Sequence, residues 1–348
     1  MFRGASEFSP ASRGPQIGAW SRPLPPPSTI TGALATLILQ CKNRPPPRGD
    51  SSAWYEEVIG IFGGKGSTAL RGPYLMNGEG TIYVQYKGEV LRLDELVKNL
   101  SKGKFLEASK ELNKTAKKFE LGHVDSVGIR LSDARKAAGK DERTLVYSTR
   151  MVDYGKIGGQ KNVSCSIIIE VLKASDSLET TLGTPKIIRL GGEGRLVEVM
   201  AKELQPVAEF VRAEGRGAKK LRLYVASPML FEASPALISK EFETLGPTVF
   251  VRSSLREKVK DYLNEINVEA TSIKIAGSLG ILGGFSIAKP VRKPVYAALH
   301  HGSVIEVSRD LPYDQEESYK VYSNGLGLFR DLGYGTVIPI PVADHAYD

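Results

Sequence analysis

A proline-stiffened lead-in to an apolar helix, near the start of the chain, constrains the fold most. Pro25, Pro26 and Pro27 each fix φ and lack an amide donor, which favours an extended segment that turns directly into a helix. The next apolar residues recur at helical spacing and predict one buried face: Ile30, Ala33, Leu34, Leu37, Ile38 and Cys41. Ser28 or Thr29 is expected to cap this helix.

Short strand and helix patterns alternate along the rest of the 348 residues, which predicts two α+β units. Strands are expected at 70–76, 81–86, 126–131, 144–151, 163–171, 187–190, 221–226, 271–276 and 303–307. The arms at 126–131 and 144–151 are expected to form a hairpin with a charged tip at 132–143. Helices are expected at 54–62, 234–245 and 254–267, and 94–119 is expected to be mostly helical or irregular.

The composition excludes several classes of protein. Two cysteines, Cys41 and Cys165, are too few for a disulfide framework or a four-cysteine zinc site. The start lacks a signal-peptide pattern, and the longest apolar run, 30–39, is shorter than the roughly 20 residues that cross a bilayer. We therefore expect a cytoplasmic protein that binds no membrane, and no metal or cofactor site is indicated.

The positive charge is concentrated in the middle of the chain. Residues 98–161 hold 15 Lys and Arg against 8 Asp and Glu, so most of the net charge of +8 falls there. Lysines of this kind usually form a solvated helix face, but here they flank the predicted hairpin. Five basic residues on or near its arms form a plausible grip for RNA: Arg130, Arg143, Arg150, Lys156 and Lys161.

A glycine-rich loop at 325–335, near the end of the chain, is a second informative segment beside the proline lead-in. Gly325, Gly327, Gly333 and Gly335 can adopt positive φ and leave amides uncovered for an anion, and Arg330 can add a phosphate contact. The alternative is a pair of tight turns. The loop lacks the Gly-Lys-Ser/Thr of a nucleotide-binding P-loop, and 62–67 fails the same pattern. The helix start at Ser28 and Thr29 is a further candidate phosphate site, or simply the start of a core helix.

Catalytic patterns are sparse. Among the four histidines, His123 beside the hairpin is the best candidate for a general base in RNA cleavage, whereas His300 and His301 are expected to be structural. The turn at 191–195, Gly-Gly-Glu-Gly-Arg, leaves two options open: Arg195 pairs with Glu193 or faces a partner.

The order of these blocks resembles the RAMP superfamily of CRISPR proteins, and specifically the family of the third subunit of the Cmr (type III-B) effector complex. The resembling blocks are Phe2-Arg3-Gly4 with 24–34, Gly128-Ile129-Arg130 with Leu145-Val146-Tyr147, 190–195, Gly283-Gly284-Phe285, 294–304 and the glycine-rich end. The resemblance covers nearly the whole chain, and its specificity lies in the order of the blocks.

The resemblance implies a fold and a domain plan. It implies two ferredoxin-like (RRM-type) domains, at 1–171 and 172–348, with a basic thumb insertion at about 98–161 in the first. Because Met1 stands directly before the Phe2 block, the first strand of the N-terminal domain is expected to be missing.

The resemblance also implies a function. The chain is expected to be a non-catalytic subunit that caps the 5′ repeat-derived tag of the guide RNA (crRNA) and bridges the large Cas subunit to the adjacent backbone RAMP subunit in antiviral defence. The predicted RNA-binding residues are Arg3, Arg13, Ser28, Thr29, Arg130, Arg143, Arg150, Lys156, Lys161, Arg195, Gly325, Gly327, Arg330, Gly333 and Gly335. The alternatives are a RAMP-type endoribonuclease acting through His123, and a scaffold that binds proteins only.

Overall fold

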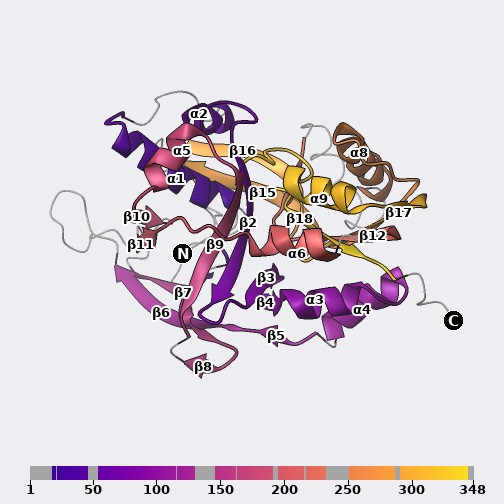
Figure 1. Cartoon of the computed structure of the whole chain (residues 1–348). Coiled ribbons are helices and arrows are strands. Elements are labelled where there is room, and N and C mark those ends of the chain that lie inside the picture. The colour runs from indigo at the N-terminus through magenta and orange to yellow at the C-terminus, as the bar shows by residue number, and fades with distance from the viewer. Residues whose placement is uncertain are drawn as a thin grey trace.

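The computed structural model describes residues 18–20, 22–45, 54–114, 116–129, 146–161, 163–190, 195–214, 217–232, 251–286 and 291–343. Within these residues the fold is mixed α/β, with helices packed around sheets that are almost entirely antiparallel (Figure 1). The predicted mixture of strands and short helices in each half is therefore confirmed.

A five-stranded antiparallel sheet, in the order β5-β4-β3-β2-β9, organises the N-terminal half. Its strands are β2 (Ala69–Asn77), β3 (Ile82–Tyr86), β4 (Glu89–Arg92), β5 (Lys118–Phe119) and β9 (Cys165–Lys173). The Asn77 side chain shapes the turn between β2 and β3, since its Oδ1 accepts the Thr81 amide at 2.8 Å. The strands predicted at 70–76, 81–86 and 163–171 are confirmed.

Helices cover both ends of this sheet (Figure 1). They are α1 (Pro27–Cys41), α2 (Trp54–Ile61), α3 (Leu93–Leu100), α4 (Phe105–Lys114) and α5 (Asp176–Leu182). The predicted cap of α1 is wrong: the N-cap residue is Pro26, without a side-chain cap, and α1 begins at Pro27. The reason is that Pro26 already has extended backbone angles and Pro27 has the φ of a first helical residue, so Ser28 and Thr29 fall inside the first turn.

The predicted hairpin is present and longer than expected. β6 (Leu121–Ile129) and β7 (Val146–Ile157) pair as antiparallel arms, and β8 (Gln160–Lys161) folds back on β7. Its predicted tip lies outside the described residues. β1 (Gly18–Trp20) runs parallel to β7, so no described strand before α1 joins the five-stranded sheet.

A second sheet, in the order β14-β17-β12-β18, organises the C-terminal half. Its elements follow the chain as β12 (Ala218–Val225), α8 (Val251–Glu265), β14 (Ser272–Ala276), β17 (Val304–Tyr313), α9 (Gln315–Asn324) and β18 (Val337–Pro341). This β-α-β-β-α-β order with antiparallel neighbours places the first strand of the unit beside both the third and the fourth. The N-terminal sheet has a different strand order.

Smaller elements complete the fold. They are β10 (Lys186–Leu190), β11 (Arg195–Val199), α6 (Pro206–Glu214), β13 (Met229–Phe231), β15 (Leu279–Ser286) and β16 (Val291–Leu299). β13, β16 and β15 form a three-stranded sheet, whereas β10 and β11 form a sheet of two. The strands predicted at 187–190, 221–226, 271–276 and 303–307 and the helices at 54–62 and 254–267 are confirmed. The helix predicted at 234–245 lies outside the described residues.

The two halves share their largest core cluster. Leu96 and Phe105 beside the N-terminal sheet belong to the same buried group as Tyr224 and Ile338 of the C-terminal sheet. The buried Glu170 carboxylate of β9 adds a polar link, because it accepts the amide of Val207 at 2.6 Å at the start of α6 and is hydrogen-bonded by the Tyr322 hydroxyl of α9. The predicted domain boundary at 171 and 172 thus lies within a strand that contacts both halves.

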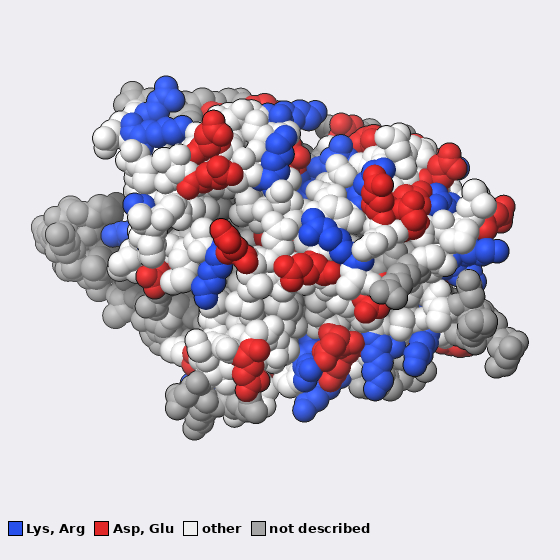
Figure 2. Space-filling model, in the orientation of Figure 1, with Lys and Arg blue, Asp and Glu red and all other residues white. Residues whose placement is uncertain are grey.

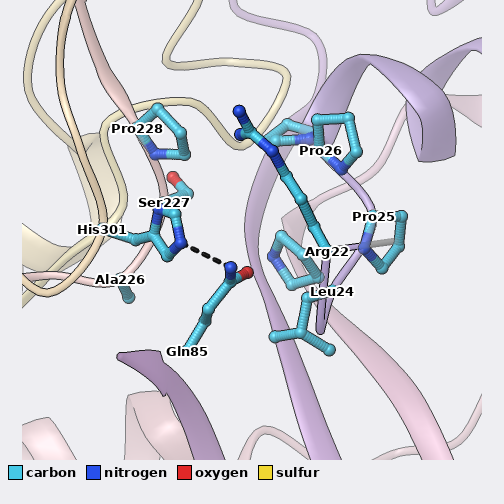
Figure 3. Close-up of a pocket in the computed structure, with 11 residues that line it drawn as sticks. Arg22, Leu24, Pro25, Pro26, Gln85, Ala226, Ser227, Pro228 and His301 are labelled. Atoms are coloured by element: carbon cyan, nitrogen blue, oxygen red, sulfur yellow. Dashed lines mark hydrogen bonds between the residues drawn. The ribbon is translucent and has the colours of Figure 1, made fainter. Parts of the chain in front are cut away.

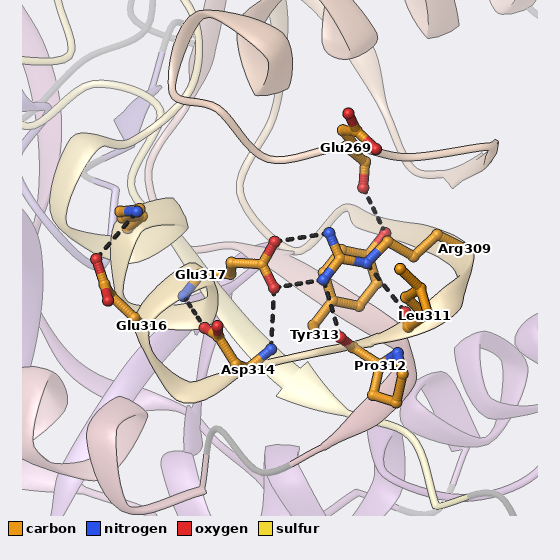
Figure 4. Close-up of polar contacts among 9 residues, drawn as sticks. Glu269, Arg309, Leu311, Pro312, Tyr313, Asp314, Glu316 and Glu317 are labelled. Atoms are coloured by element: carbon orange, nitrogen blue, oxygen red, sulfur yellow. Dashed lines mark hydrogen bonds and ion pairs between the residues drawn. The ribbon is translucent and has the colours of Figure 1, made fainter.

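A network at the corner between β17 and α9 shows why α9 starts where it does (Figure 4). The Asp314 side chain accepts the Glu317 amide at 2.7 Å, and the Glu317 carboxylate accepts the Asp314 amide at 3.0 Å, which is a capping box. Arg309 donates to the same carboxylate at 2.6 Å, and its guanidinium lies over the Tyr313 ring. The capping-box pattern Asp-x-x-Glu is present in the sequence, although no helix was predicted at 315–324.

Candidate nucleic-acid interface

The fold brings the start of the helix after the proline lead-in, at Ser28, next to the glycine-rich loop at 325–335. The Tyr334 hydroxyl, in the glycine-rich loop, hydrogen-bonds the side chain and the backbone of Ser28 in the first turn of α1. Pro27 has no amide, and the Thr29 amide donates to the Pro26 carbonyl at 2.9 Å. A phosphate at this helix start therefore has to displace Tyr334.

The four loop glycines serve close packing of the backbone. All four have positive φ and are buried. A Cβ on Gly335 would stand 1.6 Å from the Leu326 carbonyl oxygen, and one on Gly327 would stand 2.7 Å from that of Leu230. The amides of Gly325, Gly333 and Gly335 donate to backbone carbonyls. These positions do not form the solvent-open nest that the sequence had indicated.

The half-buried tip of the loop carries an aromatic residue and a cation. The Phe329 ring packs against Trp54 and Tyr55 of α2, with centroid distances of 5.1 and 4.4 Å. Arg330 Nη1 lies 3.1 Å from Glu265 Oε2 of α8, and the Arg330 side chain is 30% exposed. A phosphate can reach this guanidinium only by competing with the Glu265 carboxylate.

A small pocket lies where the proline lead-in crosses the junction of the two halves (Figure 3). Its lining residues are Arg22, Leu24, Pro25, Pro26, Pro27, Pro73, Gln85, Ala226, Ser227, Pro228 and His301. The Arg22 side chain extends between Pro26 and Pro228, and the Gln85 amide contacts His301 Nε2. The sequence analysis missed this pocket, although Arg22 beside Pro23 and the His300-His301 pair were visible signals.

His301 is held neutral in this pocket. Its Nε2 lies 3.2 Å from the Lys87 carbonyl oxygen, whereas its Nδ1 is buried and has no hydrogen-bond partner among the residues that the structure describes. Burial first, and the nearby Arg22 charge second, lower the pKa of His301 to about 3. The site therefore disfavours a second positive charge beside Arg22.

This environment predicts acid sensitivity. A histidine that stays neutral in the fold but takes a proton when unfolded gives full stability above about pH 6.5, and that contribution falls as the pH drops toward 3. We expect the free energy of unfolding to fall by up to about 1.4 kcal/mol per pH unit in this window. Urea unfolding from pH 7 to 4 should show a shallower slope for His301→Asn, and an unchanged slope for His123→Asn, whose side chain is exposed. Equal slopes in all three chains would contradict the assignment.

A lysine–aromatic strip adjoins the pocket. It consists of Tyr86, Lys87, Lys117, Lys118 and Phe119 around the β3–β4 turn and β5. Ammonium groups lie near ring centroids, with Lys118 at 5.4 Å from Tyr86 and Lys117 at 5.2 Å from Phe119. On the face drawn in Figure 2, basic and acidic residues are interspersed. Because the Tyr86 ring is buried, the strip offers a nucleic-acid backbone its lysine ammonium groups.

The other predicted RNA-binding residues fall in several places. Lys156 of β7 is paired with Asp153 at 3.0 Å and stands opposite Lys161 of β8 in the strand register. Arg150 lies in β7 and Arg195 in β11. Arg3, Arg13, Arg130 and Arg143 lie outside the described residues. The structure thus joins Ser28 to the glycine-rich loop and Lys156 to Lys161.

Among the described residues, no group of three or more His, Cys, Asp or Glu side chains could hold a metal ion. Within the same residues, no helix is both long enough and apolar enough to cross a membrane.

Comparison with known proteins identifies the relatives of this chain. It is 21% identical to the CRISPR system CMR subunit Cmr3 of Saccharolobus solfataricus, over 97% of this chain and 92% of the relative. A chain of the type III-B Cmr-beta complex bound to cognate target RNA superposes with a TM-score of 0.54, covering 97% of this chain and 92% of that chain at 19% identity. A second structure, with AMPPnP also bound, gives 0.52, covering 88% and 82% at 16% identity.

A family model defines the class first: the chain is a CRISPR-associated protein. Within that class it belongs to the family described as CRISPR-associated protein (Cas_Cmr3), whose sequence model matches residues 91–341. The resemblance inferred from the order of sequence blocks is confirmed.

Proposed function

We propose that the chain is a non-catalytic subunit of a type III-B CRISPR effector complex, in which it caps the 5′ repeat-derived tag of the guide RNA. The observation that carries this proposal is the family match across residues 91–341, together with a likeness in fold to chains of RNA-bound Cmr-beta complexes. In this role it bridges the large Cas subunit to the adjacent backbone RAMP subunit.

The proposal includes the finer fold. The C-terminal sheet, with its β-α-β-β-α-β order, supports a ferredoxin-like domain at 172–348. The N-terminal domain at 1–171 is a ferredoxin-like relative, and the β6–β7 hairpin is its thumb. The thumb sets where the guide segment of the RNA begins.

The RNA path that the geometry favours runs along the junction of the two halves. The lysines of the lysine–aromatic strip supply cations for phosphates, and the pocket beside Arg22 and Gln85 supplies polar groups for base edges. Lys156 and Lys161 extend the path onto the hairpin. Arg330 contributes after it exchanges Glu265 for a phosphate.

Charge reversal on the strip tests this path. We expect Lys117→Glu with Lys118→Glu to weaken tag binding about tenfold and to lower the salt slope by about 0.7 for each phosphate of single-stranded RNA that is no longer neutralised. The matched control is Lys219→Glu with Lys260→Glu, which changes the net charge equally at two exposed sites on β12 and α8. The measurement is binding of 5′-labelled tagged guide RNA to the reconstituted complex at several salt concentrations. Equal losses in both double variants would refute the path.

The same assay tests the alternative that the chain is a RAMP-type endoribonuclease. His123 is exposed on β6, and cleavage of repeat RNA that disappears in His123→Ala would replace the capping role with a catalytic one. Intact RNA in every lane supports the capping role.

A further inference from the structure

The exposed apolar side chains of the described residues are concentrated in the segment that contains β10 and β11 and the residues just after them. Of seven large hydrophobic residues that are exposed, four fall between positions 187 and 204. Ile187 is 71% exposed and Leu196 is 69% exposed, and Met200 and Leu204 follow at 48% and 47%. Scattered single residues of this kind are ordinary, but a cluster on one face marks an interaction surface.

The two-stranded sheet of β10 and β11 holds Ile187 and Leu196 outward, and Met200 directly follows β11. The inner face of this sheet is anchored, since Ile188 is 8% exposed and Leu190 and Val199 pack against the core cluster that contains α1. Side chains alternate along a strand, so the residues between them point to the other face. Because the inner face is fixed, Ile187 and Leu196 cannot turn into the core without breaking the register.

The same sheet has an open edge. Among the described strands, β11 pairs only with β10, so its outer row of amides and carbonyls has no strand beside it. Glu198 stands at the centre of the outward face of β11, opposite Ile187, and it forms no ion pair with another side chain in the described part of the chain. An open edge with an apolar face is a template for another strand.

We propose that the outer edge of β11 receives an extended strand from a neighbouring protein subunit. The strand carries apolar residues that cover Leu196 and Met200, separated by a basic residue that faces Glu198. Main-chain hydrogen bonds supply the affinity, and these alternate side chains supply the specificity. A protein strand fits this surface because the outward face combines the apolar Ile187 and Leu196 with one charge of each sign, Glu198 and Arg189. The inference rests on the proposed membership of a multi-subunit complex.

The test compares two exposed leucines. Leu196→Lys changes the proposed surface, whereas Leu311→Lys changes a leucine that is 73% exposed on β17. Each chain is co-expressed with the other protein subunits of its effector complex without guide RNA, and incorporation is measured by native mass spectrometry. We expect Leu196→Lys and Glu198→Lys to weaken incorporation about tenfold, as is typical when an interface anchor is removed, and Leu311→Lys to have no effect.

Hydrogen exchange locates the contact. Those amides of 195–199 that point to the open edge, away from β10, should exchange at least about tenfold more slowly with the protein subunits present than in the free chain, as expected when an open edge gains ladder hydrogen bonds. Protection by guide RNA alone, or no protection together with normal incorporation of Leu196→Lys, overturns the proposal. Tag binding by Leu196→Lys should stay unchanged, so a failure of this inference is distinguishable from a failure of the RNA-binding role.

Discussion

Replacing Arg222 with methionine is expected to lower the free energy of unfolding by about 3–5 kcal/mol, the range observed when one partner of a buried ion pair is removed. The Arg222 side chain is fully buried, and its Nε donates to Glu306 Oε2 at 2.9 Å. Its two terminal nitrogens donate to the carbonyls of Leu100, Lys102 and Gly103 at 2.6–2.9 Å. One guanidinium therefore fastens the α3–α4 connection to the C-terminal sheet.

The destabilisation arises because four acceptors are left without their donor inside the protein. Glu306 would keep only Lys274, at 3.2 Å, whose side chain is 58% exposed. The matched control is Lys274→Met, which removes the exposed partner of the same carboxylate and should cost less than about 1 kcal/mol. Urea unfolding of the two variants decides the matter, and an Arg222→Met chain as stable as Lys274→Met would contradict this account of the junction.

Gly335→Ala is expected to be nearly as damaging. Gly335 has φ of 58°, and a Cβ would stand 1.6 Å from the Leu326 carbonyl oxygen. The loop has to open, which breaks the bond from the Leu326 amide to the Gly335 carbonyl and the bond from the Gly335 amide to the Pro228 carbonyl. Left-handed strain of about 1–2 kcal/mol and two broken hydrogen bonds of about 1 kcal/mol each predict a destabilisation of about 3 kcal/mol or more.

Substitution of a second glycine distinguishes the cost of backbone strain from the cost of a steric clash. Gly80 also has positive φ, at 84°, but nothing lies within 4 Å of a Cβ there, so Gly80→Ala should cost only the strain. Thermal unfolding followed by circular dichroism compares the two variants. If Gly335→Ala melts at the same temperature as Gly80→Ala, the loop is not the tightly packed element described above.

The sequence predicted those elements whose signals are local. Strand-like runs in the sequence correctly predicted β2, β9 and β12. The N-cap of α1 is Pro26 instead of the predicted Ser28 or Thr29, because a helix can begin at a proline without a side-chain cap. The preference of Ser and Thr for N-cap positions does not reveal this.

Features that join distant segments could not be predicted in this way. The amides at the start of α6 are capped by Glu170, which lies 37 residues earlier, and Arg71 of β2 reaches the Tyr322 carbonyl at 2.8 Å at the end of α9. A pattern of polar and apolar residues does not distinguish a buried arginine from an exposed one. For the glycine-rich loop, positive φ was predicted correctly, and of the two alternatives left open, tight turns with buried glycines fit the structure better than a solvent-open nest.

The central claim concerns the tag of the guide RNA, and the most direct measurement is retention of that RNA. The complex is reconstituted with 5′-labelled guide RNA that carries or lacks the repeat-derived tag, and native and denaturing gels are run in parallel. The capping role predicts that this subunit increases retention of the tagged RNA only, and that the RNA stays intact. Retention that ignores the tag, or metal-independent cleavage at the repeat boundary, would contradict it.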